Sequence, residues 1–219
     1  MSLKLGGAAL ALVLTGCATT TFDKSQATAS NLQTAAADVQ AEERALDLTL
    51  VALNDLVNKP AVDLRIQFDL FSDNLNQLIK AARRNDLAAQ RIAASSASYL
   101  QQWDSQLVTM NYEAVRARSE ARKTEVFQQF ESVNRFYRDT QNAIHPIIDY
   151  LIDIRKALSA DLTFAGLESI RNIAANANSN TSKIQPALVK LADGLSTAGT
   201  GMSSVAVQTP PEAAGGTSP

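Results

Sequence analysis

The chain has 219 residues, of which 46% are hydrophobic, 19% charged and only 5% aromatic. This composition can bury a core, so it excludes a disordered polymer and favours one or two folded units. Twenty basic against 22 acidic residues leave a net charge of -2, which gives no electrostatic basis for nucleic-acid binding. A single cysteine and a single histidine exclude a disulfide framework and leave too few ligands for a Cys/His zinc site.

The N-terminus carries the most specific motif of the chain. An apolar run over residues 5–14 follows Lys4, and it is shorter than the roughly 20 residues that a helix needs to cross a bilayer. This run predicts a secretory signal peptide over residues 1–16. It ends in the sequence LTGC at residues 14–17, which resembles the lipobox of bacterial lipoproteins.

The lipobox resemblance implies lipidation at Cys17, the only cysteine of the chain. In such lipoproteins the cysteine receives a diacylglyceryl group, the signal is cut before it, and the new amine is acylated. Each buried methylene adds about 0.8 kcal/mol and stable anchoring takes two acyl signals, so these groups would hold the protein on a membrane. By resemblance to the sorting pattern, Ala18 in place of aspartate implies the periplasmic side of the outer membrane of a Gram-negative bacterium.

The segments on either side of the expected domain are poor in core-forming side chains. Residues 17–24 are rich in threonine and predict a flexible tether. Residues 196–219 are rich in small residues, proline and glycine, and predict a disordered tail. Residues 25–195 show helical periodicity with almost no strand signal, so we expect one helical bundle domain there.

The first two expected helices repeat apolar residues at seven-residue spacing. The first covers residues 25–58 and ends before Pro60, because the residue before a proline is pushed out of helical geometry. The second covers residues 62–108. Polar residues interrupt the apolar rows at Glu43 in the first helix and at Asn85 in the second. The rows include Leu32, Val39, Leu46 and Leu53 in the first helix, and Leu64, Phe71, Leu78, Ile92 and Tyr99 in the second.

The third and fourth expected helices continue the pattern. The third covers residues 112–158, and Pro146 should kink it without necessarily ending it. The fourth covers residues 164–195, with Thr163 as a candidate N-cap. Its helical pattern is weakest over residues 176–182, which are poor in helix formers.

Heptads on four consecutive helices with short links predict an all-α fold, an elongated antiparallel bundle with coiled-coil-like packing. At a rise of 1.5 Å per residue, the second and third helices would each be roughly 70 Å long, and the other two about a third shorter. The links at residues 59–61 and 159–163 lie at one end, so the shorter helices should pack there. The tip of the long central hairpin, residues 95–126, should then protrude, and we call it the hairpin tip.

The hairpin tip is the candidate interaction site. It holds the only tryptophan, and amphipathic aromatic side chains are favoured at protein contacts and membrane interfaces. The alternative interpretation makes the aromatics a local hairpin core and the charges a solvated face with intrahelical pairs. The candidate interaction residues are Tyr99, Trp103, Met110, Tyr112, Arg116 and Arg118.

Residues at the helix junctions carry a family resemblance. They are Trp103-Asp104, Gln106-Leu107, Asn111, Arg116, Arg118-Ser119-Glu120, Arg122, Tyr137 and Asp161-Leu162-Thr163. In these positions the chain, over about residues 46–195, resembles the helical family of bacterial secreted proteins named domain of unknown function twenty-nine fifty-nine. The resemblance implies an all-helical protein outside the cytoplasm, and it brings no catalytic residues.

Catalytic and cofactor patterns are weak. His145 has no second histidine and no Glu-x-x-His motif beside it, which favours a surface histidine over a haem or metal ligand. Asp149 and Asp153 have the spacing of paired carboxylates, but such pairs are common on solvated helices. G-x-S-x-G, phosphate-binding glycine loops and His-Glu-x-x-His do not occur. We therefore expect no enzyme, metal or cofactor.

The expected function is that of a structural or protein-interaction module of the cell envelope, with an envelope protein or a second copy as partner. The alternative is binding of a lipid or small apolar ligand in the bundle core, where Ala82, Ala89 and Ala174 leave room between apolar rows. A carrier should show a continuous apolar cavity along those rows, whereas a spacer should show a dense seam.

Overall fold

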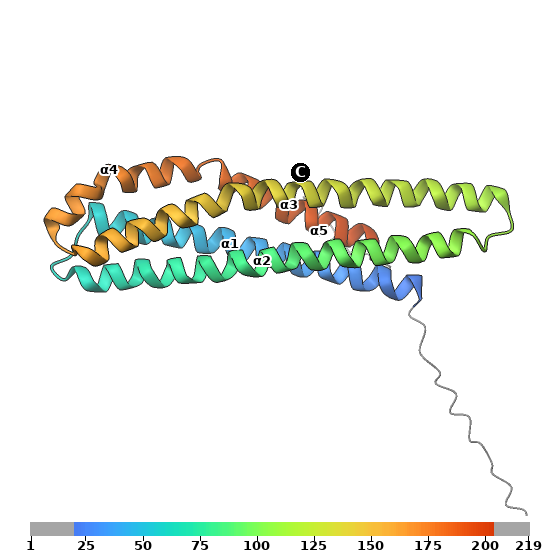
Figure 1. The fold of residues 1–219 in the computed structure, drawn as a ribbon, viewed down its shortest axis with the longest axis horizontal. Helices are drawn as coiled ribbons and strands as arrows, with labels where there is room; N and C mark the ends of the chain where they lie inside the picture. The colour runs from blue at the N-terminus through green and yellow to red at the C-terminus, as the bar shows by residue number, and fades with distance from the viewer. Residues whose placement is uncertain (1–19, 204–219) are drawn as a thin grey trace, which may run out of the picture.

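The computed structural model describes residues 20–203 as an elongated all-α bundle without strands in that range (Figure 1), which confirms the predicted fold class. The predicted signal peptide, the predicted lipidation residue Cys17 and residues 204–219 of the predicted tail lie outside the described residues. The helices in chain order are α1 Thr21–Asn58, α2 Leu64–Leu107, α3 Glu113–Ala160, α4 Phe164–Thr181 and α5 Ile184–Met202.

The long hairpin of α2 and α3 runs the length of the molecule (Figure 1). α1 lies along α2 and makes its most extensive contact with it, and its second contact is with α5. α4 lies at the end of the bundle opposite the hairpin tip, where α1 is linked to α2. α5 then runs back along the bundle and contacts α1 and α3. The hairpin extends beyond the start of α1 and the end of α5, as the expected helix lengths predict.

Apolar rows from all five helices meet in one core. Side chains on these rows are almost fully excluded from solvent, and they form a dense seam along the bundle axis. The largest of the fully buried side chains are Tyr137, Phe71, Leu32, Leu46, Leu53, Leu56, Leu75, Leu78, Ile92, Ile144, Leu151 and Leu158. Towards the hairpin tip this core thins, because residues 111–125 bury no side chain and Val126 is the first buried residue of α3.

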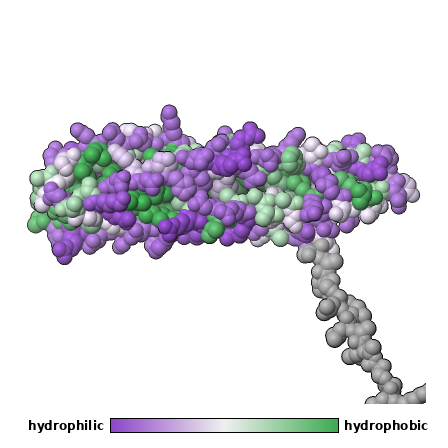
Figure 2. Space-filling view, viewed as in Figure 1, coloured by the Kyte–Doolittle hydropathy of each residue, from purple (hydrophilic) through white to green (hydrophobic). Residues whose placement is uncertain are grey.

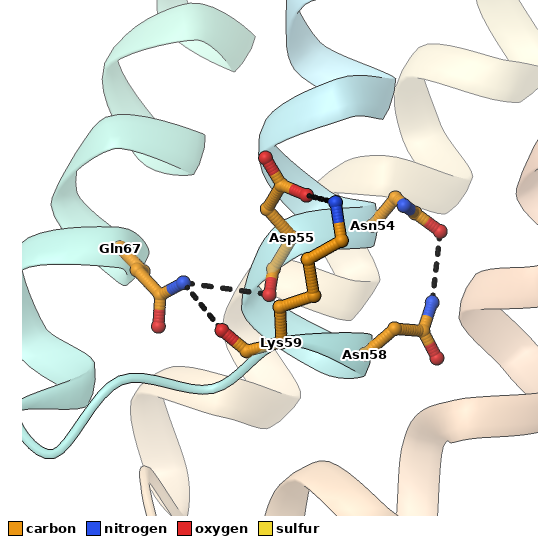
Figure 3. Close-up of polar contacts among 5 residues, drawn as sticks. All are labelled: Asn54, Asp55, Asn58, Lys59 and Gln67. Atoms are coloured by element: carbon orange, nitrogen blue, oxygen red, sulfur yellow. Dashed lines mark hydrogen bonds and ion pairs between the residues drawn. The ribbon is translucent and has the colours of Figure 1, made fainter.

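A side-chain cap ends α1 and fixes the turn into α2 (Figure 3). The amide nitrogen of Gln67 donates hydrogen bonds to the backbone carbonyls of Lys59 at 3.0 Å and Asp55 at 3.4 Å. Lys59 also pairs with the Asp55 carboxylate at 3.0 Å, and Asn58 donates to Asn54 at 2.8 Å. The two bonds from Gln67 satisfy carbonyls that the end of a helix leaves without partners.

α1 begins at Thr21, so residues 21–24 of the predicted tether are helical. The Thr20 hydroxyl accepts a hydrogen bond from the Asp23 backbone nitrogen at 3.1 Å, and the Asp23 carboxylate accepts one from the Thr20 backbone nitrogen at 2.9 Å. This reciprocal pair is a capping box, which stabilises a helix start. The Thr20 hydroxyl, at 2.7 Å, and the Thr20 backbone nitrogen both donate to the Asp23 carboxylate, and these two bonds hold the pKa of Asp23 below its usual value.

The single helix expected over residues 164–195 is two helices. The break after Thr181 falls at the stretch that is poor in helix formers, and the Thr181 hydroxyl donates there to the carbonyls of Ala177 and Asn178. α5 then continues to Met202, so residues 196–202 are helical and the predicted start of the disordered tail is wrong. Small residues explain the extension, because they let the last turns of α5 approach α1 closely.

α3 passes through Pro146 without ending, as predicted. Proline lacks the backbone N–H that would bond to the preceding turn, which bends a helix. In Figure 1 the orange part of α3 runs obliquely and its yellow-green part runs straight towards the hairpin tip. α3 therefore has two arms with different directions in this view, and Pro146 lies inside the helix.

Candidate functional site

The inner side of the hairpin tip is a clasp between α2 and α3. Trp103 is half-buried, and its indole Nε1 donates a hydrogen bond to the Ser119 hydroxyl across the hairpin at 2.9 Å. The buried ring of Tyr99 lies one turn earlier, with its centroid 5.4 Å from that of Trp103. Burial raises the pKa of Tyr99, against smaller effects of Ser25 and Arg122. These contacts support the local-core interpretation of Tyr99 and Trp103.

The outer side of the hairpin tip exposes apolar side chains around the turn. Tyr112 is 80% exposed at the N-cap position of α3, and Val108 is 82% exposed at the end of α2. Val115 is exposed on the first turn of α3, and Met110 is half-buried between the helices. Val108 and Val115 are not among the interaction residues predicted from the sequence. The sequence feature that could have identified them is an apolar residue that lies beside a turn and outside the heptad rows.

Charged side chains surround this apolar group. Arg116 pairs with Glu113 on the same helix, and Lys123 pairs with Asp104 across the hairpin. Arg118 is exposed on the first turns of α3. Exposed pairs of this kind contribute about 0–1 kcal/mol to stability. The predicted residues Arg116 and Arg118 therefore form a polar rim rather than a structural brace.

A groove joins the hairpin tip to the N-terminal end of α1. Its volume is about 570 Å³, and Phe22 of α1 borders it opposite Trp103 and Met110. Phe22 is itself exposed, and Thr20 lies at the edge of the groove. The chain therefore enters the bundle directly beside the hairpin tip.

A second groove runs between the middle of α3 and α5. Its volume is about 500 Å³, and its apolar lining includes Val133, Phe136 and Leu195. The Lys190 ammonium lies 4.8 Å from the centre of the Phe136 ring, which is cation–π distance. We call this feature the α3–α5 groove. Ala82 and Ala174, two of the alanines considered for a ligand in the core, are buried in the core seam outside it, and Ala89 packs half-buried against that seam.

A layer of polar side chains interrupts the core midway along the bundle. Glu42 on α1 and Asn85 on α2 are both 0% exposed, and Tyr137 and Gln141 on α3 are buried with them. The Asn85 amide nitrogen donates to one carboxyl oxygen of Glu42, and to the Asp38 backbone carbonyl at 3.4 Å. We call Glu42, Asn85, Tyr137 and Gln141 the buried polar layer.

The buried polar layer perturbs its carboxyl group strongly. Burial raises the pKa of Glu42 to about 7, because a low-dielectric surrounding disfavours the charged form. The Asn85 and Gln141 amides oppose this rise in pKa, the Asp86 carboxylate adds to it, and His145 opposes it weakly. A carboxyl group of this kind changes its protonation near neutral pH.

The apolar spacing of the sequence predicted this layer only in part. It identified Asn85 as a polar break, but it placed the break of the first helix at Glu43 rather than Glu42. Glu42 lies three positions after Val39 and four before Leu46, so it follows the alternating spacing that faces the core. Burial also raises the pKa of Tyr137, and the Glu42 carboxylate adds to that rise.

The residues considered for catalysis lie on the surface. His145 Nε2 is 3.3 Å from Asp86 Oδ1, and both side chains are partly exposed. Asp153 pairs with Lys156 at 2.9 Å, and Asp149 is exposed. Within residues 20–203 no three histidine, cysteine or acidic side chains gather as a metal site, and no helix is long and apolar enough to cross a membrane.

No family model, curated protein or solved structure matches the chain. The resemblance to the family of unknown function therefore stays a prediction.

Proposed function

We propose that this protein is a lipoprotein anchored on the periplasmic side of the outer membrane, and that it acts as a non-catalytic interaction module of the cell envelope. The observation that carries the proposal is the exposed apolar group of Val108, Tyr112 and Val115 at the protruding end of a rigid bundle. Exposed aromatic and apolar side chains inside a charged rim are typical of protein contact sites.

The position of the chain entry supports a location of the hairpin tip near the membrane. Three residues of chain, from Cys17 to Thr20, span at most roughly 11 Å. Thr20 borders the same groove as Met110 of the hairpin tip. Lipid on Cys17 would therefore hold this end of the bundle close to the bilayer, where the partner would be an envelope protein at the membrane surface or a second copy.

The shape of the bundle supports a spacer role. α3 alone has 48 residues, which corresponds to roughly 70 Å of helix. Figure 2 shows a largely hydrophilic side of the rod with separate apolar patches, including one near the end where the hairpin protrudes. A rod of this kind can hold a contact site at one end while its other end reaches away from the membrane.

Photocrosslinking in cells tests the proposal. A crosslinking amino acid replaces Tyr112 in the full chain, and a matched variant carries it at Phe164, which is 58% exposed at the opposite end. We expect the Tyr112 variant to crosslink to one discrete protein or to itself, and the Phe164 variant to lack that product. Crosslinks to lipid alone would make the hairpin tip a membrane contact, and identical patterns from both variants would overturn the proposal.

The α3–α5 groove favours a second candidate function, binding of a small apolar ligand. Its volume lies within the range of about 300–1,000 Å³ that is usual for ligand sites. We expect a fluorescent fatty-acid probe to bind the full chain and to bind Gly194→Phe more weakly, because a side chain at residue 194 would occupy open space in the groove. The control Val189→Phe alters the other side of α5. Equal binding by both variants would exclude the groove.

A further inference from the structure

Five side-chain atoms of the buried polar layer have no hydrogen-bond partner. Three buried oxygens that can only accept lack a donor, namely Glu42 Oε1, Asn85 Oδ1 and Gln141 Oε1. The Tyr137 hydroxyl is also buried without a partner, and Gln141 Nε2 lowers the pKa of Glu42 without completing a hydrogen bond to it. A proton on Glu42 turns one acceptor into a donor, and the two amide oxygens are acceptors within the same layer.

Each neighbouring element contributes few charges to this site. On α1, Asp38 is already paired with Arg84 of α2 at 3.6 Å. On α2, Asp86 disfavours a charge on Glu42, and its own partner is His145 of α3.

The remaining groups near the layer do not compensate a Glu42 carboxylate. Arg91 of α2 acts on Tyr137 of α3, and it is not among the groups that shift Glu42. On α5, Leu188 and Ala192 are apolar and buried. The acidic residue of this part of α5, Asp193, lines a surface groove together with Glu43 of α1. A carboxylate at Glu42 would therefore be buried without a cationic partner, which is strongly unfavourable.

The helix that closes the layer has a built-in weak point. Gln141 lies five residues before Pro146, next to Asn142, whose carbonyl the missing Pro146 N–H leaves without its helical hydrogen bond. Beyond the layer, the arm of α3 towards the hairpin tip buries few side chains. Movement of this arm about Pro146 would admit water to the layer at a lower cost than movement of α1 or α2, which make the most extensive contact in the bundle.

We propose that the buried polar layer is a proton-binding site, and that the proton on Glu42 holds the arm of α3 against α1 and α2. The proton comes from solvent and forms an O–H bond on the carboxyl group, without any further reaction. The partly exposed pair of His145 on α3 and Asp86 on α2 acts electrostatically on Glu42. Loss of the proton releases the arm, which carries half of the hairpin tip.

Hydrogen–deuterium exchange on the full chain tests this site. Exchange of residues 126–145 is compared at about pH 5.5 and about pH 8.5, after correction for the intrinsic pH dependence of amide exchange. In the unmodified chain we expect the open fraction to rise at least about tenfold, which corresponds to one pKa unit. In Glu42→Gln, whose amide stays neutral, we expect no rise.

Glu43→Gln is the matched control, because Glu43 is the adjacent acidic residue outside the layer. We expect it to keep the pH dependence of the unmodified chain. An unchanged open fraction in the unmodified chain, or a persistent rise in Glu42→Gln, would overturn the proposal. If Glu42→Gln does not fold, carbon-13 NMR of the side-chain carboxyls in the unmodified chain decides, and a Glu42 midpoint near an ordinary glutamate value refutes a proton site.

Discussion

Glu42 occupies a position that the heptad pattern normally gives to an apolar side chain. Its neighbours along the core face, Val39 and Leu46, are fully buried, so the carboxyl group has no route to solvent along α1. A single buried polar position of this kind can fix the register of packed helices at some cost in stability. The same residue can therefore specify the alignment of α1, α2 and α3 and make that alignment sensitive to pH.

Replacing Glu42 by glutamine should change how stability depends on pH. The pKa of Glu42 is about 7 in the folded chain and about 4.5 when unfolded, so between these values only the folded state keeps the proton. The stabilisation is fully present below pH 4.5, falls as pH rises, and is lost above about pH 7. The loss amounts to about 3 kcal/mol relative to Glu42→Gln. Urea denaturation of both proteins across this range measures it, and parallel curves would contradict the prediction.

The Trp103–Ser119 hydrogen bond should contribute to the stability of the hairpin. Trp103→Phe and Ser119→Ala each remove one partner of the 2.9 Å bond, and the double variant removes both. We expect a coupling free energy of about 1 kcal/mol from the double-mutant cycle, measured by urea denaturation. A coupling near zero would show that the clasp is not formed and would return Trp103 to the list of free contact residues.

At the scale of helices, the apolar period was sufficient to predict most elements. Seven-residue spacing identified the long helices, and Pro60 and Thr163 marked boundaries, because both act through local backbone chemistry. The end of α5 was not predictable in this way. Residues 196–202 have small side chains with little apolar surface to bury. Their contact with α1 depends on how closely the two helices approach, which is a property of the tertiary structure.

Gly199 and Gly194 give a matched test of that helix contact. A Cβ at Gly199 would lie 3.1 Å from the Ala29 backbone oxygen, whereas a Cβ at Gly194 would meet nothing within 4 Å. We expect Gly199→Val to destabilise the bundle by about 1–3 kcal/mol through overpacking. Gly194→Ala should instead stabilise it by about 0.5–1 kcal/mol through helix propensity. Thermal denaturation compares them, and equal effects would argue against close packing of α5 on α1.

At the scale of the whole molecule, the candidate site divides into predictable and unpredictable parts. Helix lengths and link positions were enough to predict a protruding hairpin tip, since they follow from counting residues. They did not show that Tyr99 and Trp103 face inward while Val108 and Val115 face outward. That difference arises from the direction of each side chain relative to the opposite helix, which spacing along one helix does not define.

Anchoring should depend on Cys17 alone. Cys17→Ser removes the thiol that a diacylglyceryl group requires, and serine differs from cysteine by one atom, so the bundle over residues 20–203 should fold unchanged. We expect the variant to move from the membrane fraction to the soluble fraction, because stable attachment takes two acyl signals. Thr19→Ser is the matched control and should stay in the membrane fraction. Retention of Cys17→Ser would instead show that the hairpin tip, through Val108, Tyr112 and Val115, holds the protein at the envelope by itself.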